Sequence, residues 1–328
     1  MTKVLVTGAG GFIGSHLVDA LLARGDEVVA LDVGRKLPVN LSEAAGRPGF
    51  VYRRCDVTQP LSVRRAFSDG PGAVVHAAAT VGVASYVASP METVESNVIG
   101  TRTVLRTAME RSVRFVYLSS SEVFGRNPSV PWLETADRVL GDPSLDRWSY
   151  SSSKGLCEHL VNAAHSEHGL PTSIARPFNI YGARQRPAFV VPLTVHRVLN
   201  GNAPVVYGDG AQTRCFTYIA DLIAALLLCL ERDAAVGETF NFGFPKERTI
   251  LEAVRAVLAA CGSDLVPTHA DAKATFGAGF DEIPRRVPDV RKAERVLGWV
   301  ARSDLPDGLR PTVEWARAHP EWLRLPLG

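Results

Sequence analysis

The first half of the chain alternates short, mostly apolar runs with longer runs in which apolar residues recur every three or four positions. The apolar runs predict strands at Val4–Thr7, Val28–Asp32, Phe50–Arg53, Ala73–Ala77, Phe115–Ser119 and Thr172–Arg176. The longer runs predict helices, most clearly at Ile13–Arg24 and Tyr150–His168. Strands that are apolar throughout and separated by helices are typical of a parallel sheet covered on both faces. The pattern therefore predicts a doubly wound α/β fold.

The regular alternation weakens after Arg176, where prolines interrupt the pattern and the predicted elements become short. Helices are still predicted at Ala220–Glu231, Ile250–Cys261 and Pro311–Ala318, and Pro267–Pro288 is rich in loop-forming residues. We therefore expect residues 1–177 to form the parallel-sheet domain and residues 178–328 to form a smaller α/β lobe. Parts of residues 215–245 are expected to return to the first domain.

Composition and charge narrow the functional classes. The 328 residues include 36 Lys+Arg and 34 Asp+Glu, which gives a formal net charge of +2, and 46% of the residues are hydrophobic. This composition excludes a mostly disordered chain. A charge so close to neutral gives no indication of a nucleic acid or an anionic membrane surface as a partner. The apolar stretch Ile219–Leu230 is too short to span a bilayer, and glycines interrupt the first apolar run too early for a signal peptide.

The cysteines are odd in number and widely spaced: Cys55, Cys157, Cys215, Cys229 and Cys261. Since no two of them form a CxxC pair, the pattern argues against a disulfide framework and against a structural zinc site, so we expect no metal. A reducing, cytoplasmic location is the expectation that follows.

A glycine-rich turn, Gly8-Ala-Gly-Gly11-Phe-Ile-Gly14, joins the first predicted strand to the first helix. Glycines let backbone N–H groups approach a pyrophosphate, and the N-terminus of the following helix stabilises its negative charge. Asp32 ends the second predicted strand 18 residues after Gly14, where a carboxylate can accept hydrogen bonds from the adenosine ribose. Without this context the turn would indicate only a tight connection. With it, we expect a dinucleotide site of the Rossmann type.

Asp32 also bears on which dinucleotide is bound. Its charge would repel a ribose 2′-phosphate, so NAD is expected rather than NADP, although Arg35 and Lys36 follow closely and soften that choice. Asp56 follows the third predicted strand and can accept a hydrogen bond from the adenine amino group. An aspartate that starts a turn is an equally good interpretation of Asp56.

Tyr150 and Lys154 are four residues apart at the start of a predicted helix. Residues at this spacing lie on one face, so the phenol and the ammonium face the same space. Nearby cations favour phenolate, which makes Tyr150 a candidate general base for a hydroxyl group. The spacing alone also fits a surface pair on an amphipathic helix; its place after a nucleotide-binding turn favours the catalytic interpretation.

The fifth predicted strand ends in Ser119-Ser120-Ser121-Glu122. Ligands bind at the carboxyl ends of parallel strands in this architecture. A hydroxyl there can hydrogen-bond the substrate oxygen and relay its proton to Tyr150. Glu122 would face the carbons next to the one that is oxidised, with a surface glutamate as the alternative.

Together these motifs resemble the extended short-chain dehydrogenase/reductases that modify nucleotide sugars, and the resemblance covers nearly the whole chain. The motifs follow in the family's order: TGAGGFIG, His76-Ala-Ala-Ala79, Asn97, SSSEVFG, YSSSK and Arg176-Pro-Phe-Asn179-Ile-Tyr-Gly182. Tyr207–Asp221 and Arg285–Asp289 resemble the elements that grip the nucleotide diphosphate.

The resemblance implies a role for each of these residues. The catalytic residues are Ser120, Tyr150 and Lys154, with Glu122 beside them, and bound NAD+ takes a hydride from carbon 4 of the sugar. The residues implied at the cofactor, besides Tyr150 and Lys154, are Gly8, Gly11, Phe12, Ile13, Gly14, Asp32, Asp56, Val57, Ala77, Ala79, Asn97 and Pro177. The residues implied at a UDP-sugar, or at a dTDP-sugar, are Ser121, Asn179, Arg184, Arg186, Tyr207, Arg214 and Arg286. Residues 1–177 would then be the NAD-binding domain and residues 178–328 the nucleotide-sugar-binding lobe.

Three fates of the 4-keto intermediate are common in the family: 4-epimerisation, loss of the carbon 6 carboxylate, and 4,6-dehydration. The Ser-Ser-Glu run and the stretch that begins at Arg147 resemble UDP-glucuronate decarboxylases, whereas many epimerases carry a small residue in place of Glu122. Dehydratases often have an aspartate where this chain has Ser121. Arg184-Gln-Arg186-Pro187 resembles a loop of epimerases, some of which act on UDP-glucuronate. We rank 4-epimerisation of a UDP-hexose or UDP-hexuronate first, decarboxylation second and dehydration third.

Two interpretations from other classes stay open. A non-enzymatic NAD-binding protein would not need Ser120, Tyr150 and Lys154, and an NADP-linked reductase of small carbonyl compounds would not need the diphosphate arginines. The resemblance also implies a homodimer, formed by the helices at Thr93–Ala108 and Tyr150–His168.

Overall fold

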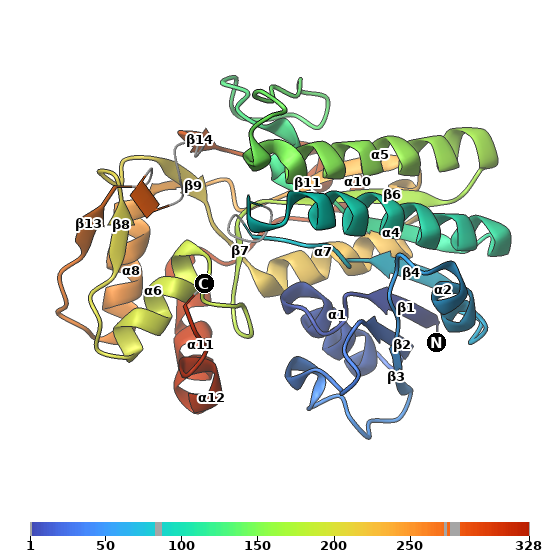
Figure 1. Cartoon of the computed structure of the whole chain (residues 1–328), viewed down its shortest axis with the longest axis horizontal. Coiled ribbons are helices and arrows are strands. Elements are labelled where there is room, and N and C mark those ends of the chain that lie inside the picture. The colour runs from blue at the N-terminus through green and yellow to red at the C-terminus, as the bar shows by residue number, and fades with distance from the viewer. Residues whose placement is uncertain (1, 83–86, 272–273, 276–282, 328) are drawn as a thin grey trace.

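A wholly parallel, seven-stranded sheet forms the larger part of the molecule (Figure 1). The computed structural model describes residues 2–82, 87–271, 274–275 and 283–327. The strand order is β11-β6-β5-β4-β1-β2-β3, and every neighbouring pair runs parallel. The strands are β1 (Lys3–Thr7), β2 (Glu27–Asp32), β3 (Phe50–Arg54), β4 (Ala73–His76), β5 (Arg114–Leu118), β6 (Thr172–Pro177) and β11 (Glu238–Phe242).

Helices cover both faces of this sheet. One face carries α1 (Phe12–Ala23), α7 (Ile219–Glu231) and α10 (Arg291–Leu297), and the other carries α2 (Pro60–Phe67), α4 (Pro90–Arg111) and α5 (Ser149–His168). Side chains alternate between the faces along a strand, so Val4 and Val6 pack with α1 while Leu5 between them packs with the opposite layer. The predicted doubly wound α/β fold is confirmed.

The chain leaves this domain after β6 and later returns to it. Helix α7 packs on α1, and β11 pairs with β6 at the edge of the sheet. Helix α10 packs on β11, so residues beyond 245 also belong to this domain. The six predicted strands are confirmed as β1–β6, whereas β11 was not predicted.

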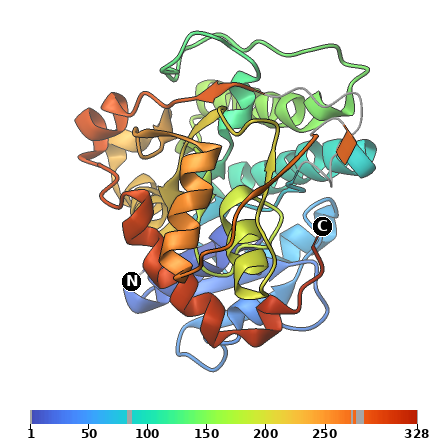
Figure 2. The ribbon, with the colours of Figure 1, turned by 90° about the vertical axis from the view of Figure 1, so that its left-hand side faces the viewer.

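A smaller lobe lies at one end of the sheet domain, as Figures 1 and 2 show. Its helices α6 (Val190–Leu199), α8 (Ile250–Cys261) and α11 (Leu305–Ala318) enclose a core of their own, and α12 (Pro320–Leu323) packs beside α11. Its strands are short: β7 (Ile180–Tyr181), β8 (Val205–Tyr207), β9 (Thr213–Cys215), β10 (Thr217–Tyr218), β12 (Glu247–Thr249), β13 (Thr268–Ala270) and β14 (Arg285–Arg286). The predicted smaller α/β lobe is confirmed in its architecture.

Helix α11 begins six residues earlier than predicted, at Leu305 instead of Pro311. The side chain of Asp304 caps the helix and forms a capping box with Asp307, so the helix starts there and Pro311 lies inside it. The predicted helix Ile250–Cys261 is confirmed with the same bounds in α8. Of the predicted loop-rich stretch, residues 272–273 and 276–282 lie outside the described residues.

The described residues also form four short 3-10 helices: η1 (Val39–Leu41), η2 (Ser121–Phe124), η3 (Asp146–Trp148) and η4 (Asp233–Ala235). An aromatic cluster that includes Phe124, Trp132, Trp148 and Phe178 fixes η2 against η3. Across the described part of the chain, no helix has the length and apolarity that a membrane span requires.

Candidate active site

The predicted glycine turn lies between β1 and the N-terminus of α1. Gly8 has a left-handed φ of +65°, and a Cβ on Gly14 would lie 2.2 Å from the Gly8 carbonyl oxygen, so the turn presses closely against the helix. Gly11 is the N-cap, and no side chain caps the helix. Phe12 and Ile13 form its first turn. Backbone N–H groups at such a helix end form an anion site, so the turn fits a pyrophosphate.

Asp32 closes the other side of this turn. Its two carboxylate oxygens accept hydrogen bonds from the backbone N–H groups of Gly10, at 2.9 Å, and Val33, at 2.8 Å. The carboxylate therefore stands at the carboxyl end of β2, beside the glycine turn. Asp56 is exposed, and its Oδ1 accepts from the backbone N–H and the hydroxyl of Thr58. That contact forms a turn, which was the second interpretation of Asp56.

The segment after β4 lines the same edge of the sheet, and a buried polar network supports it. Ala77 and Ala79 are half-buried in it. Asn97 lies behind this segment: its side-chain oxygen accepts from the Thr80 backbone N–H at 3.1 Å, and its Nδ2 donates to Ser153 Oγ at 3.0 Å. The structure thus gives Asn97 a supporting position between the β4 loop and helix α5. Val57 packs against α4 close to Gly100.

Ser120 and Tyr150 meet at the carboxyl end of β5. Ser120 is the N-cap of η2, where its Oγ accepts from the Glu122 backbone N–H at 3.2 Å, and its side chain is also hydrogen-bonded to the Tyr150 phenol. Burial raises the pKa of Tyr150 well above its ordinary value; the Ser120 hydrogen bond lowers it and the Glu122 charge raises it further. The protein without ligand therefore holds Tyr150 as a phenol.

Lys154 lies one turn further along α5, almost wholly buried. Its Nζ donates to the Leu118 carbonyl oxygen at 2.7 Å and lies 4.7 Å from the centre of the Tyr117 ring. Burial lowers the pKa of Lys154 to about 8, against the opposing influence of Cys157 and Glu158. We expected the ammonium to lower the pKa of Tyr150, but here burial dominates the phenol, and the Lys154 contact is with strand β5.

Glu122 is clamped by two arginines from distant parts of the chain. Its Oε2 lies 2.9 Å from Arg147 Nη2, and its Oε1 accepts a hydrogen bond from Arg286 Nη1. Burial raises the pKa of Glu122, but the Arg286 and Arg147 charges outweigh it and lower the pKa to about 2. Glu122, Arg147 and Arg286 therefore form a largely buried cluster, here called the Glu122 cluster, with one more positive than negative charge.

The residues implied at the substrate come from both lobes. Arg214 on β9 and Arg286 on β14 are partners in neighbouring strands, so the structure brings these two side by side. Arg214 Nη1 donates to the backbone oxygens of Thr213 at 2.7 Å and Pro284 at 3.4 Å. Asn179 has a φ of +41°, and its Nδ2 donates to the Cys215 oxygen at 3.1 Å.

The other implied residues are less concentrated. Ser121 is buried in η2 next to the acid–base residues, and Pro177 ends β6. Tyr207 is half-buried at the end of β8, and Arg186 is exposed.

Arg184 is placed differently from the sequence-based expectation. Its guanidinium pairs with Asp19 on α1 at 2.6 Å and with Glu43 at 3.2 Å. The neighbouring Ala183 oxygen contacts His16 Nε2 at 2.9 Å. Arg184 therefore links the smaller lobe to helix α1 instead of presenting its charge to a sugar carboxylate. The local motif gave no sign of this, because Asp19 and Glu43 lie far away in sequence.

A second buried ion pair supports the site and was missed. Arg176, at the end of β6, donates to both carboxylate oxygens of Glu158 on α5, at 2.8 and 2.6 Å. Ser119, the residue before Ser120, donates to Glu158 Oε1 at 2.5 Å. The sequence carried a signal for Glu158, since it follows Lys154 by four residues on the same helix face.

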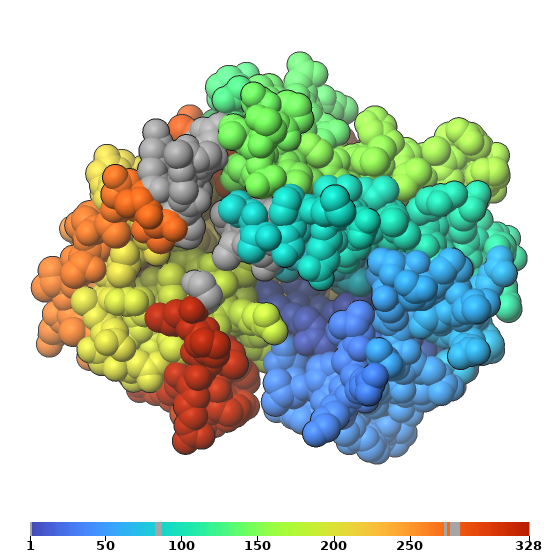
Figure 3. Space-filling view, viewed as in Figure 1, coloured from blue at the N-terminus to red at the C-terminus, as the bar shows by residue number. Residues whose placement is uncertain are grey.

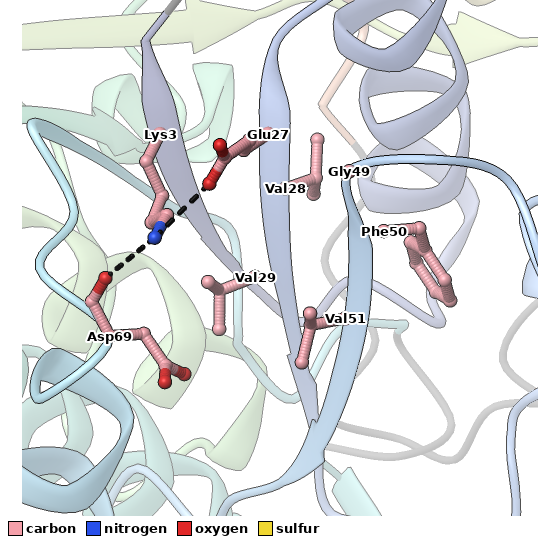
Figure 4. Close-up of a pocket in the computed structure, with 8 residues that line it drawn as sticks. All are labelled: Lys3, Glu27, Val28, Val29, Gly49, Phe50, Val51 and Asp69. Atoms are coloured by element: carbon pink, nitrogen blue, oxygen red, sulfur yellow. Dashed lines mark hydrogen bonds and ion pairs between the residues drawn. The ribbon is translucent and has the colours of Figure 1, made fainter.

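The carboxyl end of the sheet also faces the smaller lobe. In the space-filling view the surface is hollowed between the red C-terminal helices and the blue N-terminal segments (Figure 3). A separate cavity of about 140 Å³ lies at the opposite end of strands β1–β3 and includes Lys3, Glu27 and Asp69 in its wall (Figure 4). Lys3 Nζ forms an ion pair with Glu27 at 3.1 Å and donates a hydrogen bond to the backbone carbonyl oxygen of Asp69 at 2.9 Å. The charge of Lys3 is therefore already paired, and this cavity is remote from Ser120 and Tyr150.

Among the described residues, no group of three or more histidine, cysteine, aspartate or glutamate side chains could hold a metal ion.

Comparison with known proteins identifies the family. The model of the NAD dependent epimerase/dehydratase family matches residues 4–243, which include the glycine turn, Ser120, Tyr150 and Lys154. The chain belongs to this family. The predicted family membership, enzyme class and use of NAD are therefore confirmed at this level.

The individual relatives differ in their reactions. The chain is 33% identical to a UDP-N-acetyl-alpha-D-glucosaminuronate decarboxylase from Bacillus cytotoxicus, over 96% of this chain and 98% of that protein. It is 32% identical, with a TM-score of 0.86, to a dTDP-glucose 4,6-dehydratase from Streptomyces venezuelae solved with NAD, over 98% of each chain. It is 27% identical, with a TM-score of 0.85, to a UDP-glucuronic acid 4-epimerase from Bacillus cereus solved with UDP-glucuronic acid and NAD, over 96% of this chain and 99% of that chain.

Proposed function

We propose that this enzyme oxidises carbon 4 of a nucleotide sugar transiently and releases a product in which carbon 4 is reduced again. The hydrogen-bonded pair Ser120–Tyr150, with Lys154 one turn away on the same helix, supports this proposal most directly. NAD+, when bound by the glycine turn and Asp32, supplies the hydride acceptor and a positive charge. The positive charges of bound NAD+ and Lys154 would favour loss of the Tyr150 proton to solvent, so that Tyr150 is a phenolate in the loaded enzyme. Ser120 then holds the sugar hydroxyl, and the Tyr150 phenolate accepts the hydroxyl proton as the hydride leaves carbon 4.

The Glu122 cluster supports an anionic sugar. A buried group of charges with an excess positive charge is most stable when an anion joins it. The nucleotide diphosphate is one such anion, and Arg214 lies beside Arg286 to receive it. Glu122 also adjoins the acid–base pair, because its backbone N–H donates a hydrogen bond to Ser120 Oγ. In the proposed binding mode the cluster therefore lies next to the sugar ring. A hexuronate, which carries a carboxylate at carbon 6, fits that charge better than a neutral hexose.

We infer that the reaction is decarboxylation of a UDP-hexuronate, ahead of the 4-epimerisation that the sequence ranked first. Once carbon 4 is a ketone, the bond between carbons 5 and 6 breaks, its electron pair moves to the ketone oxygen as enolate, and neutral carbon dioxide leaves. Carbon 5 then takes a proton from water, the ketone re-forms, and carbon 4 takes back the hydride while its oxygen takes back the proton held by Tyr150. An arginine that paired only with the sugar carboxylate would stabilise the 4-keto acid before carbon dioxide is lost, which would slow the reaction. Glu122 shares the charges of Arg147 and Arg286 and so weakens their attraction for the sugar carboxylate.

The same cluster is less suited to dehydration. Removal of the carbon 5 proton needs a base, and a carboxylate with a pKa of about 2 is a weak one. Ser121 stands where the resemblance places the aspartate of many dehydratases. The likeness to the Bacillus cereus 4-epimerase favours epimerisation of a UDP-hexuronate as the second candidate.

The test is to incubate the purified protein, supplied with NAD+, separately with UDP-glucuronate, UDP-N-acetylglucosaminuronate, UDP-glucose and dTDP-glucose, and to identify products by NMR. A UDP-pentose from either uronate is the expected result. If the product is instead a UDP-galacturonate-type epimer that keeps carbon 6, the proposed decarboxylation is wrong and the enzyme is a 4-epimerase. The Tyr150→Phe variant serves as the control for residual contaminating activity.

We further propose that the protein is a homodimer through the exposed face of α4 and α5. Apolar side chains are exposed along this face: Met91 (74%), Val94 (38%) and Ile99 (42%) on α4, and Leu156 (48%) on α5. The two helices lie side by side on the outside of the sheet (Figure 1). Exposed apolar side chains gathered on two neighbouring helices are typical of association surfaces.

A further inference from the structure

Two short segments are joined by two parallel links at the candidate active site. One segment, Ser120–Glu122, begins η2; the other, Arg147–Tyr150, runs from η3 into α5. The first link is the hydrogen bond between Ser120 and Tyr150, and the second is the ion pair between Glu122 and Arg147. Ser120 and Glu122 are two positions apart in the first segment, and Arg147 and Tyr150 are three positions apart in the second. The ion pair therefore lies close along the chain to the acid–base pair in both segments.

Arg147 is held more rigidly than an ordinary ion-pair partner. Its side chain is only 4% exposed, and its guanidinium lies 5.2 Å from the centre of the Trp148 ring. Trp148 is itself buried and packs in the same aromatic cluster as Phe124, which ends η2. Glu122 and Arg147 thus belong to one packed unit of the larger domain, whereas Arg286 reaches Glu122 from β14.

This difference separates the roles of the two arginines. Arg286 lies beside Arg214, so it stands between Glu122 and the region implied for the diphosphate. Arg147 approaches Glu122 from the side of the catalytic helix. A buried carboxylate needs a fixed partner to stay charged and oriented when a second anion enters the site.

We propose that Arg147 is a positioning residue, which holds Glu122 in the orientation required for the step that follows oxidation at carbon 4. The inference rests on the proposed decarboxylation and names a residue that acts through Glu122 and does not touch the sugar. Its removal is expected to leave the Ser120–Tyr150 chemistry largely intact and to slow the loss of carbon dioxide. A misplacement of about 1 Å at a reacting group typically costs about a hundredfold in rate.

The test follows two steps of one turnover in the NAD-loaded enzyme. Nicotinamide absorbance reports oxidation of carbon 4, and release of label from carbon 6 of UDP-glucuronate reports decarboxylation. Wild type, Arg147→Met, Glu122→Gln and the double variant form a cycle. Arg64→Met is the matched control, because Arg64 on α2 also pairs with a glutamate, Glu110 on α4, but does so at the exposed surface.

For Arg147→Met we expect oxidation within about threefold of wild type and label release slower by about a hundredfold. In the Glu122→Gln background, the same substitution should change label release by less than about threefold, since its effect passes through Glu122. Equal slowing of both steps, or full additivity in the cycle, would overturn the proposal. If Arg147→Met does not fold, Arg147→Gln is measured for the same ratio of rates. If the wild-type enzyme releases no label, the proposed decarboxylation itself is wrong. If the wild-type enzyme and Arg147→Met release label at the same rate, only the role of Arg147 is wrong.

Discussion

Glu158 and Arg176 form a buried, two-pronged ion pair directly behind the residue that precedes Ser120. Removing one partner leaves an uncompensated buried charge, which typically costs about 3–5 kcal/mol. We therefore expect Arg176→Met to lower the free energy of unfolding by about that amount in urea titrations. Arg285→Met, which removes an exposed arginine from its pair with Glu247, should have almost no effect. Equal stability of the two variants would contradict this account of the buried pair.

Tyr150→Phe tests the acid–base assignment. The substitution removes one oxygen from a side chain that is 6% exposed, so the fold should be preserved. Because a positioned acid–base group contributes about a hundredfold or more, turnover should fall by at least that factor while NAD+ binding is unchanged. Steady-state rates and a cofactor titration are the measurements. Turnover equal to that of wild type would remove Tyr150 from the mechanism.

Glu122→Gln distinguishes the fates of the 4-keto intermediate. The amide keeps the size of the side chain but removes the charge that balances Arg147 and Arg286. Decarboxylation should slow by about a hundredfold or more while label release stays measurable, whereas epimerisation, which needs no charge at this position, should be barely changed. NMR of the products over time gives the answer. Survival of both product identity and rate would reduce Glu122 to a structural role.

The pH dependence of stability provides an independent test of the Glu122 cluster. The two arginines lower the pKa of Glu122 from 4.5 to about 2 in spite of its burial. Between those values the unfolded chain binds more protons than the folded one, so this contribution is complete above about pH 4.5 and is lost as the pH falls towards 2. As the pH falls from about 4.5 towards 2, the wild-type protein should therefore lose stability relative to Glu122→Gln. Unfolding in urea at a series of pH values measures it, and a difference independent of pH would exclude the ion cluster.

Leu156→Arg tests the proposed dimer. A charge placed on the exposed face of α4 and α5 should prevent association, because desolvating an unpaired charge is costly. Light scattering should give about twice the chain mass of 35.4 kDa for wild type and the single mass for the variant. Val266→Arg is the control, since Val266 is 76% exposed in the smaller lobe, away from α4 and α5. A wild-type protein with the single mass would disprove the dimer.

The sequence predicted the sheet domain well because its signals are local. Short, mostly apolar runs predicted β1–β6, and the glycine turn and Asp32 indicated which end of the strands carries the site. Strand β11 lacked such a signal: its sequence, ETFNF, alternates in polarity, and only its pairing with β6, more than sixty residues earlier, makes it a strand of this sheet. The predicted helix was shorter than α11 because a proline such as Pro311 is common at the start of a helix. The helix in fact starts six residues earlier, where the side chain of Asp304 caps it.

Distant contacts explain what sequence reasoning missed in the candidate site. Arg286 lies 164 positions from Glu122, and no local pattern relates the two. Arg184 was expected at the sugar because its neighbours resemble a known loop, but its partner Asp19 is 165 positions away. Tyr150 and Lys154 were found because their relationship is one helix turn, whereas the pKa of Tyr150 depends on burial that spacing does not report.

The path of the chain through the two lobes limits how the protein can be divided. Since α7 and β11 follow the first elements of the smaller lobe, a fragment ending at residue 177 would expose the β6 edge and the apolar side of α1. Such a fragment is expected to aggregate when expressed alone. For the same reason, a chimera that exchanges the smaller lobe with that of a relative requires five crossover points: one after β6, one on each side of residues 219–242, and one on each side of α10.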